Sequence, residues 1–128
     1  MLRRLDHLLV LTGDLEASKR FYCDTLGLED GPRPAFPFAG HWLYLEGIPC
    51  VHLADRASYE ANASRMGLTV EEAPVDHAAF AAEGYEELQA RLEKAGIEVT
   101  TNAPPGAAKR QLFFADPNGL RIELNVTD

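Results

Sequence analysis

An internal repeat is the feature that most limits the folds open to this chain. The segment Asp6-His7-Leu8 returns as Asp76-His77-Ala78 in the second half of the sequence. Gly27 and Gly96, which end two amphipathic segments, are separated by nearly the same interval as the two histidines. Each half has too little surface to bury its own helix and sheet face. We therefore expect two βαβββ modules that pair into one curved mixed sheet with the helices outside, an α+β fold.

The first half opens with a predicted strand, and a helix capped by Asp14 and ended by Gly27 follows it. The turn Glu46–Pro49 then joins two further strands. The segment Leu28–Gly40 contains three prolines, so any strand within it is short or irregular. The strands predicted with regular pairing are Leu5–Thr12, His41–Leu45 and Cys50–Ala54.

The second half repeats this order after a polar, alanine-rich connection, Arg56–Pro74, in which a short helix is the only predicted element. We expect module 1 at about 3–55, a linker at 56–74 and module 2 at about 75–127, within a single domain of residues 1–128. Apolar residues at helical spacing predict one helix from Tyr85 to Ala95. Strands are predicted around Asp76–Phe80, Glu98–Thr101, Gln111–Ala115 and Arg121–Val126.

The last two strands are joined by Asp116-Pro117-Asn118-Gly119, a turn in which proline and glycine supply the required φ angles. Side chains alternate along the closing strand, with Ile122, Leu124 and Val126 on one face. Glu123 therefore lies mid-strand on the other face. A carboxylate there requires water, a counter-charge or a metal ion. A simple ion pair of Glu123 with Arg110 or Arg121 is the alternative.

Four candidate ligands occupy equivalent places in the two halves. His7 and His77 lie in the opening strands, and His52 and Glu123 lie in the closing strands at nearly the same repeat interval. If the halves pair about a pseudo-two-fold axis, these side chains converge in the cleft of the joined sheet. Imidazole and carboxylate suit one divalent ion, Zn, Ni, Co, Mn or Fe. A strand histidine taken singly is more often a hydrogen-bonded partner. His41 stays in that class because it has no repeat counterpart.

The segment Arg33–Phe38 is a candidate wall for a substrate pocket. Prolines stiffen it, Phe36 and Phe38 could line a pocket, and Arg33 could meet an anionic substrate. The alternative is an ordinary proline-rich surface loop. Trp42, on the next strand, belongs either to the core or to the same pocket.

Charge and composition exclude some functions. The formal net charge of −8 disfavours binding to nucleic acid or to an anionic membrane. No stretch approaches the ~20 apolar residues of a membrane-spanning helix. Cys23 and Cys50 do not suggest a disulfide framework. A cytoplasmic protein with reduced thiols is the expectation.

The sequence resembles the vicinal oxygen chelate superfamily, which includes glyoxalase I, extradiol dioxygenases, and fosfomycin and bleomycin resistance proteins. The resemblance covers nearly the whole chain. The segments that carry it are Asp6-His7-Leu8, Asp14–Tyr22 leading to Leu26-Gly27-Leu28, Asp76-His77, and Phe114–Gly119 with Ile122-Glu123-Leu124.

The resemblance implies a metal cleft in which His7, His77 and Glu123 match three shared ligand positions. His52 falls where glyoxalase I has a glutamate as fourth ligand, so Glu123 would be the only metal-bound carboxylate and the catalytic base. No residue marks a glutathione site.

Three functions are therefore considered. The first is a metal-dependent lyase or isomerase resembling glyoxalase I that acts on a small oxygen-chelating substrate. The second is an Fe(II) or Mn(II) ring-cleaving dioxygenase, with His52 and Tyr44 as possible additional residues beside the metal. The third is a drug-sequestering binding protein of the bleomycin resistance type. In related small members each site draws ligands from both subunits, so the resemblance also implies a homodimer with shared sites.

Overall fold

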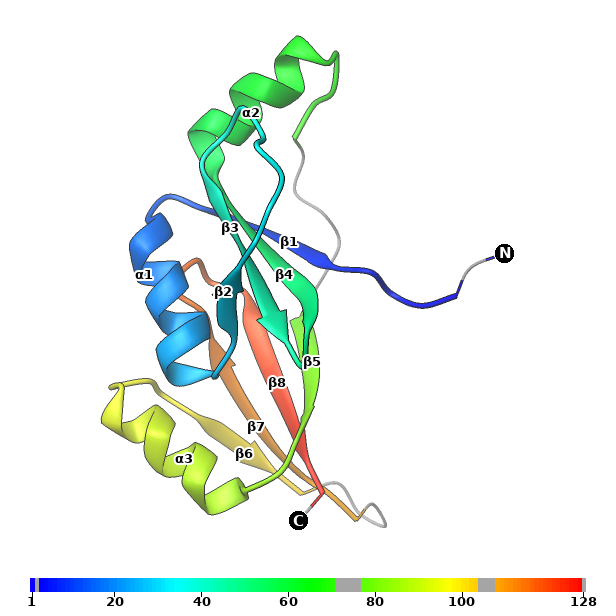
Figure 1. Ribbon diagram of the computed structural model, residues 1–128. Coiled ribbons are helices and arrows are strands. Elements are labelled where there is room, and N and C mark those ends of the chain that lie inside the picture. Colours follow the sequence, from blue (N-terminus) through cyan, green and yellow to red (C-terminus); the bar gives the residue numbers. More distant parts are fainter. Residues whose placement is uncertain (2, 71–76, 104–107, 128) are drawn as a thin grey trace. The chain divides into compact units, whose positions relative to one another are not determined.

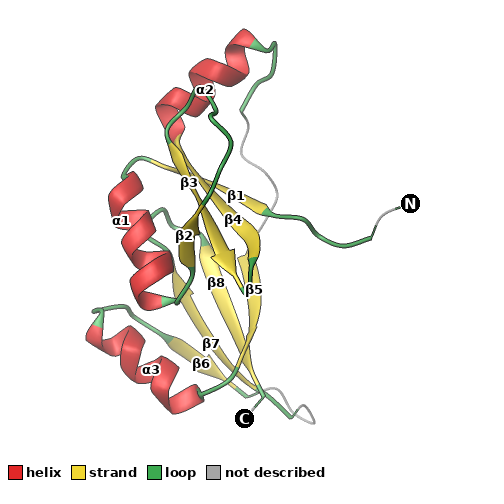
Figure 2. Cartoon of the chain, viewed as in Figure 1, coloured by secondary structure: helices red, strands yellow, loops and turns green. Residues whose placement is uncertain are grey.

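The computed structural model describes residues 1–128 except 2, 71–76, 104–107 and 128. The chain divides into two compact units, Met1–Glu72 and Ala73–Asp128. Each unit contains a four-stranded mixed sheet with helices, which confirms the α+β class. Figure 2 shows the strands and helices of both. Asp76, part of the predicted repeat, lies outside the described residues.

The first unit has the strand order β1-β4-β3-β2, in which β1 pairs parallel with β4 and the other pairs are antiparallel (Figure 1). Helix α1 continues directly into a π-helical turn, η1. The elements are β1 (Leu8–Thr12), α1 (Leu15–Arg20), η1 (Phe21–Thr25), β2 (Glu29–Gly31), β3 (Gly40–Leu45), β4 (Ile48–Asp55) and α2 (Arg56–Arg65).

Local signals explain where α1 begins and how it is attached to the sheet. The Asp14 side chain accepts a hydrogen bond from the Ala17 backbone N–H at 3.0 Å, as predicted for the N-cap. Buried Ser18 donates to the Thr12 hydroxyl at 2.8 Å, which ties α1 to β1. The largest fully buried side chains of this unit include Tyr22, Leu43, Leu53 and Val51.

The hairpin between β3 and β4 is tighter than the predicted turn Glu46–Pro49. Leu45 pairs with Ile48, so only Glu46 and Gly47 form the loop. Both have positive φ, 50° and 78°, as a type I′ turn requires. Pro49 therefore lies within β4. The pairing of β3 with β4 is irregular at this point, so the N–H that proline lacks is not needed for a regular ladder of backbone hydrogen bonds.

The predicted linker begins with a longer helix than expected. Asp55 caps α2 by accepting from the Ser58 N–H at 3.0 Å, and α2 packs against β4 and β1. Residues 56–65 therefore belong to the first unit. Among the described residues, no helix is long and apolar enough to cross a membrane.

The second unit repeats the topology with the order β5-β8-β7-β6, again with one parallel pair, β5 with β8. Its core contains Leu112, Ile122, Leu124 and Val126. The elements are β5 (His77–Ala82), α3 (Tyr85–Lys94), β6 (Thr100–Asn102), β7 (Arg110–Ala115) and β8 (Arg121–Val126).

The turn between β7 and β8 forms as predicted. The Asp116 carboxylate accepts from the backbone N–H groups of Asn118 and Leu120, both at 2.8 Å. Gly119 has φ +88°, which a side chain would strain. The alternation along β8 is also confirmed, because Ile122, Leu124 and Val126 are buried on one face.

Boundaries differ from the predictions where strands end near polar turns. The opening strand begins at Leu8 rather than Leu5, so His7 directly precedes it. The strand expected at Glu98–Thr101 is Thr100–Asn102. In each case pairing with a neighbouring strand, and not the apolar run, sets the limit.

Candidate metal and substrate site

The strand registers place the predicted ligands equivalently in the two units. Leu9 pairs with His52, and Ala79 pairs with Glu123. His7 lies two residues before Leu9, the strand partner of His52. In the same way, His77 lies two residues before Ala79, the strand partner of Glu123. Side chains two residues apart along a strand share a face, so each unit forms one diagonal pair of donors.

In the first unit the pair is His7 and His52. Their rings stack with centroids 3.8 Å apart and planes 11° apart. His7 Nδ1 lies 2.7 Å from an Asp6 carboxylate oxygen, and His52 Nε2 lies 3.0 Å from the Pro49 carbonyl oxygen. Because both partners are acceptors, these nitrogens carry the protons. Nε2 of His7 and Nδ1 of His52 are then the nitrogens with free lone pairs.

The surroundings favour a neutral His52. Burial lowers the pKa of His52 most, and the positive charge that His7 can carry adds to the effect. The hydrogen bond from His7 likewise lowers the pKa of Asp6, so that carboxylate stays ionised. A neutral imidazole whose other nitrogen donates to a carboxylate or carbonyl is the usual form of a histidine metal ligand.

In the second unit the pair is His77 and Glu123. His77 Nε2 lies 3.0 Å from Glu123 Oε2. Glu123 is only 9% exposed, and its Oε1 accepts from Gln111 Nε2 at 2.8 Å. Gln111 also donates to Asn125 at 3.0 Å and accepts from Asn102 at 2.9 Å. The carboxylate is therefore held on both oxygens.

Among the described contacts Glu123 pairs with His77 and Gln111, and none joins it to Arg110 or Arg121, the predicted alternative. Arg110 instead lies 3.8 Å above the Tyr85 ring and 3.1 Å from Glu86.

Imidazole and carboxylate are donor types that divalent metal ions take in proteins. His77 Nε2 and Glu123 Oε2 lie 3.0 Å apart, so the two candidate donor atoms of the second unit already face each other. Within the described part of the chain, no three His, Cys, Asp or Glu side chains gather as a metal group. Each unit by itself brings two candidate donors together, His7 with His52 and His77 with Glu123, and each donor has a hydrogen-bond partner or stacking neighbour that orients it.

A pocket of about 290 Å³ opens beside the histidine pair in the first unit. It contains all four residues predicted for substrate binding, Arg33, Phe36, Phe38 and Trp42. Trp42 stacks on His52 with centroids 4.1 Å apart, because the two residues are paired across β3 and β4. The remaining lining residues are Asp6, His7, Leu9, His52, Leu53 and Tyr59.

Several of these contacts were not predicted. Tyr59 lies on α2, within the predicted linker 56–74. The Asp55 cap followed by helix-forming residues was the available signal. For Gln111 the sequence predicts a place in a strand but no contact with Glu123. Gln111 lies two residues before Phe113, which is the cross-strand partner of Glu123. Gln111 and Glu123 could therefore have been assigned to the same face of the sheet.

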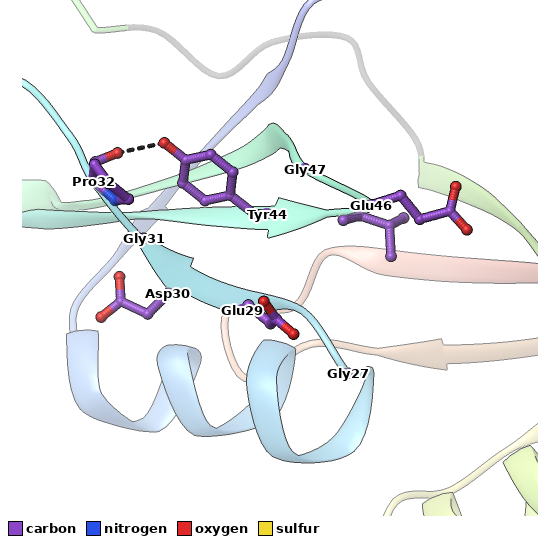
Figure 3. A pocket seen from close by; sticks show the side chains of 9 residues that line it. Gly27, Glu29, Asp30, Gly31, Pro32, Tyr44, Glu46 and Gly47 are labelled. Carbon is purple, nitrogen blue, oxygen red and sulfur yellow. Dashed lines mark hydrogen bonds between the residues drawn. The ribbon is translucent and has the colours of Figure 1, made fainter.

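Two other candidates lie away from this pocket. The Tyr44 hydroxyl donates to the Pro32 carbonyl at 2.6 Å and borders a different, acidic pocket that includes Glu29 and Asp30 (Figure 3). Tyr44 and His52 therefore line different pockets, although both were considered as additional residues of a ring-cleaving site. His41 Nδ1 lies 3.2 Å from Asp30, in keeping with a structural role.

Comparison with known proteins identifies relatives across nearly the whole chain. Glutathione transferase FosA from Serratia marcescens is 33% identical over 129 residues, covering 98% of this chain and 82% of the relative. Glyoxylase I 4 from Arabidopsis thaliana is 30% identical over 126 residues, covering 96% of this chain and 70% of the relative.

Solved structures share the fold. Lactoylglutathione lyase from Agrobacterium tumefaciens superposes with a TM-score of 0.77 at 19% identity, covering 98% of this chain and 95% of that one. The fosfomycin resistance protein FosX from Listeria monocytogenes gives 0.74 at 17%, covering 98% and 94%. The sequence model of the Glyoxalase/Bleomycin resistance protein/Dioxygenase superfamily matches residues 4–124. The chain therefore belongs to this superfamily.

Proposed function

We propose that this chain is a metal-dependent enzyme, a glyoxalase I-like lyase or isomerase that acts on a small oxygen-chelating substrate. One divalent ion would be held by His7, His77 and Glu123, with His52 as the fourth ligand or a close neighbour. The observation that carries the proposal is the equal register of the two donor pairs, Leu9 with His52 and Ala79 with Glu123. Members of the superfamily commonly use a divalent metal, which supports it.

A divalent ion bound there would act as a Lewis acid on a substrate oxygen. Glu123 is the candidate base that moves a proton from the carbon next to a substrate carbonyl. Gln111 orients the carboxylate through Oε1, and Oε2 faces His77. The aromatic wall of Phe36, Phe38 and Trp42 would exclude water from the substrate.

A second candidate is transfer of a thiol such as glutathione. It is favoured by the 33% identity to a protein named as a glutathione transferase. The two candidates share the metal site and differ in the second substrate. A ring-cleaving dioxygenase is less favoured because Tyr44 lies in another pocket. A drug-sequestering protein is less favoured because both donor pairs are retained.

We also propose a cytoplasmic homodimer. Superfamily members are typically small-molecule-binding dimers, and both cysteines are free, as a reducing compartment would keep them. Each metal site would draw His7 and His52 from one subunit and His77 and Glu123 from the other.

The test is anaerobic purification followed by elemental analysis and a substrate screen. About one Zn, Ni or Co per chain, with turnover of α-ketoaldehyde–thiol adducts, supports the first candidate. Bound Fe(II) with catechol cleavage would replace it with the dioxygenase. Metal absent even after reconstitution would refute both and favour a binding protein.

A further inference from the structure

The pocket of the first unit has an aromatic wall that metal binding alone does not require. The rings of Phe36 and Phe38 stack with centroids 5.2 Å apart and planes 8° apart. Tyr59 meets Phe38 edge-on at 5.1 Å, and Trp42 lies 6.2 Å from Phe36. Such a wall packs planar rings better than small aliphatic groups, because rings gain from stacked and edge-on contacts.

Arg33 supplies a cation against this wall. Its guanidinium carbon lies 5.4 Å and 5.3 Å from the ring centroids of Phe36 and Phe38. One terminal nitrogen, Nη2, donates to the Phe38 carbonyl at 3.0 Å. Its Nε is buried and, among the described residues, has no hydrogen-bond partner. A buried donor without a partner is costly, so the protein itself leaves part of the hydrogen-bonding capacity of Arg33 unused.

No described carboxylate forms an ion pair with Arg33. Asp6 lines the same pocket, but its carboxylate oxygens lie 2.7 Å from His7 and 3.5 Å from Arg4. The positive charge of Arg33 is thus available to an anionic ligand at the pocket.

We propose that this pocket selects substrates in which an aromatic ring is joined to a carboxylate. The ring packs on Phe36, Phe38 and Trp42, and the carboxylate pairs with the guanidinium of Arg33. This inference rests on the proposed function, because the pocket contains His7 and His52, and it names the substrate class.

Binding can be measured without metal or turnover, because Trp42 is the only tryptophan and lies in the pocket. Chelator-treated protein is titrated with three probes while Trp42 fluorescence is followed. Phenylacetate carries ring and charge, acetate lacks the ring, and phenylacetamide lacks the charge. We expect phenylacetate to bind at least about tenfold tighter than either of the others, since each lacks one contact.

Two variants locate the contacts. Arg33→Gln should weaken phenylacetate about tenfold and leave phenylacetamide unchanged, whereas Arg56→Gln, a surface control paired with Glu60, should change neither. Phe38→Leu should weaken both aromatic probes severalfold. If Arg33→Gln does not fold, the three probes on the unaltered protein still decide the question.

Equal binding of phenylacetate and phenylacetamide, or of phenylacetate and acetate, would overturn the inference. Metal-dependent turnover of purely aliphatic substrates together with no phenylacetate binding would refute this inference and leave the proposed function standing. Selective phenylacetate binding by a protein that never binds metal would refute the proposed function and leave this inference standing.

Discussion

His7 and His52 lie ring on ring, 3.8 Å between centroids, although one precedes the first strand and the other lies in the fourth. The parallel pairing of β1 with β4 brings them together, and Asp6 and Pro49 then fix which nitrogen of each carries its proton. Two imidazoles so close disfavour a second positive charge. Burial, and then the neighbouring His7, lower the pKa of His52, which favours the neutral form that a histidine metal ligand needs.

Removal of the histidines should rank them as metal ligands. His77→Ala should lower divalent metal affinity at least about 100-fold, and His52→Ala by a smaller factor, about 10- to 100-fold. Isothermal titration of chelator-treated protein measures both. His41→Ala is the matched control, because His41 pairs with Asp30 instead. Equal losses in the first two variants would make His52 a full ligand.

Glu123→Gln should reduce turnover more than metal occupancy. The amide keeps the size of the side chain but cannot take a proton, so we expect kcat to fall about 10²- to 10⁴-fold. Metal content and kcat are measured on the same preparation, with the exposed Glu60→Gln as control. A metal-loaded Glu123→Gln protein with normal kcat would contradict the base assignment.

Gln111→Leu should loosen the metal site without unfolding the unit. It removes the donor to Glu123 Oε1, and loss of such an orienting contact typically costs about 10- to 100-fold in metal affinity or activity. Gln89→Leu on α3 is the matched control. Unchanged affinity and kcat would show that His77 alone orients the carboxylate.

The cap of α2 should make the stability of the first unit sensitive to acid. Hydrogen bonds from the Ser58 backbone N–H and then its side chain lower the pKa of Asp55 below the ordinary value of 3.8. The ionised cap therefore stabilises the fold at pH above 3.8, and this contribution is lost as the pH falls through the folded-state pKa.

Urea unfolding of Asp55→Ala and of the unaltered protein, at neutral pH and well below pH 3.8, checks this. The difference in unfolding free energy should be larger at neutral pH. A difference that is the same at both pH values would mean that the charge of the cap is not involved.

Mixing variants should reveal whether sites are shared between chains. When His7→Ala and Glu123→Gln chains are refolded together, random pairing makes half of the dimers mixed, and one of the two sites in each mixed dimer is intact. About a quarter of all sites should then regain metal and activity. A protein that light scattering shows to be a monomer with metal bound would instead have both units of one chain at one site.

The repeat, the caps and the closing hairpin could be predicted from local chemistry. Asp14 caps α1, Gly119 takes the positive φ, and Glu123 lies on the face opposite Ile122, because each depends on neighbours within a few residues. The nearly constant repeat interval by itself matched His7 with His77 and His52 with Glu123.

Only the tertiary structure decided which side chains touch. The 3.8 Å stack of His7 on His52, the hold of Gln111 on Glu123, and the place of Tyr59 beside Phe38 depend on strand register and on where α2 packs. These contacts join residues of different elements that are well separated along the chain. Local propensity assigns a side chain to a face, but cross-strand pairing and packing select its partner on that face.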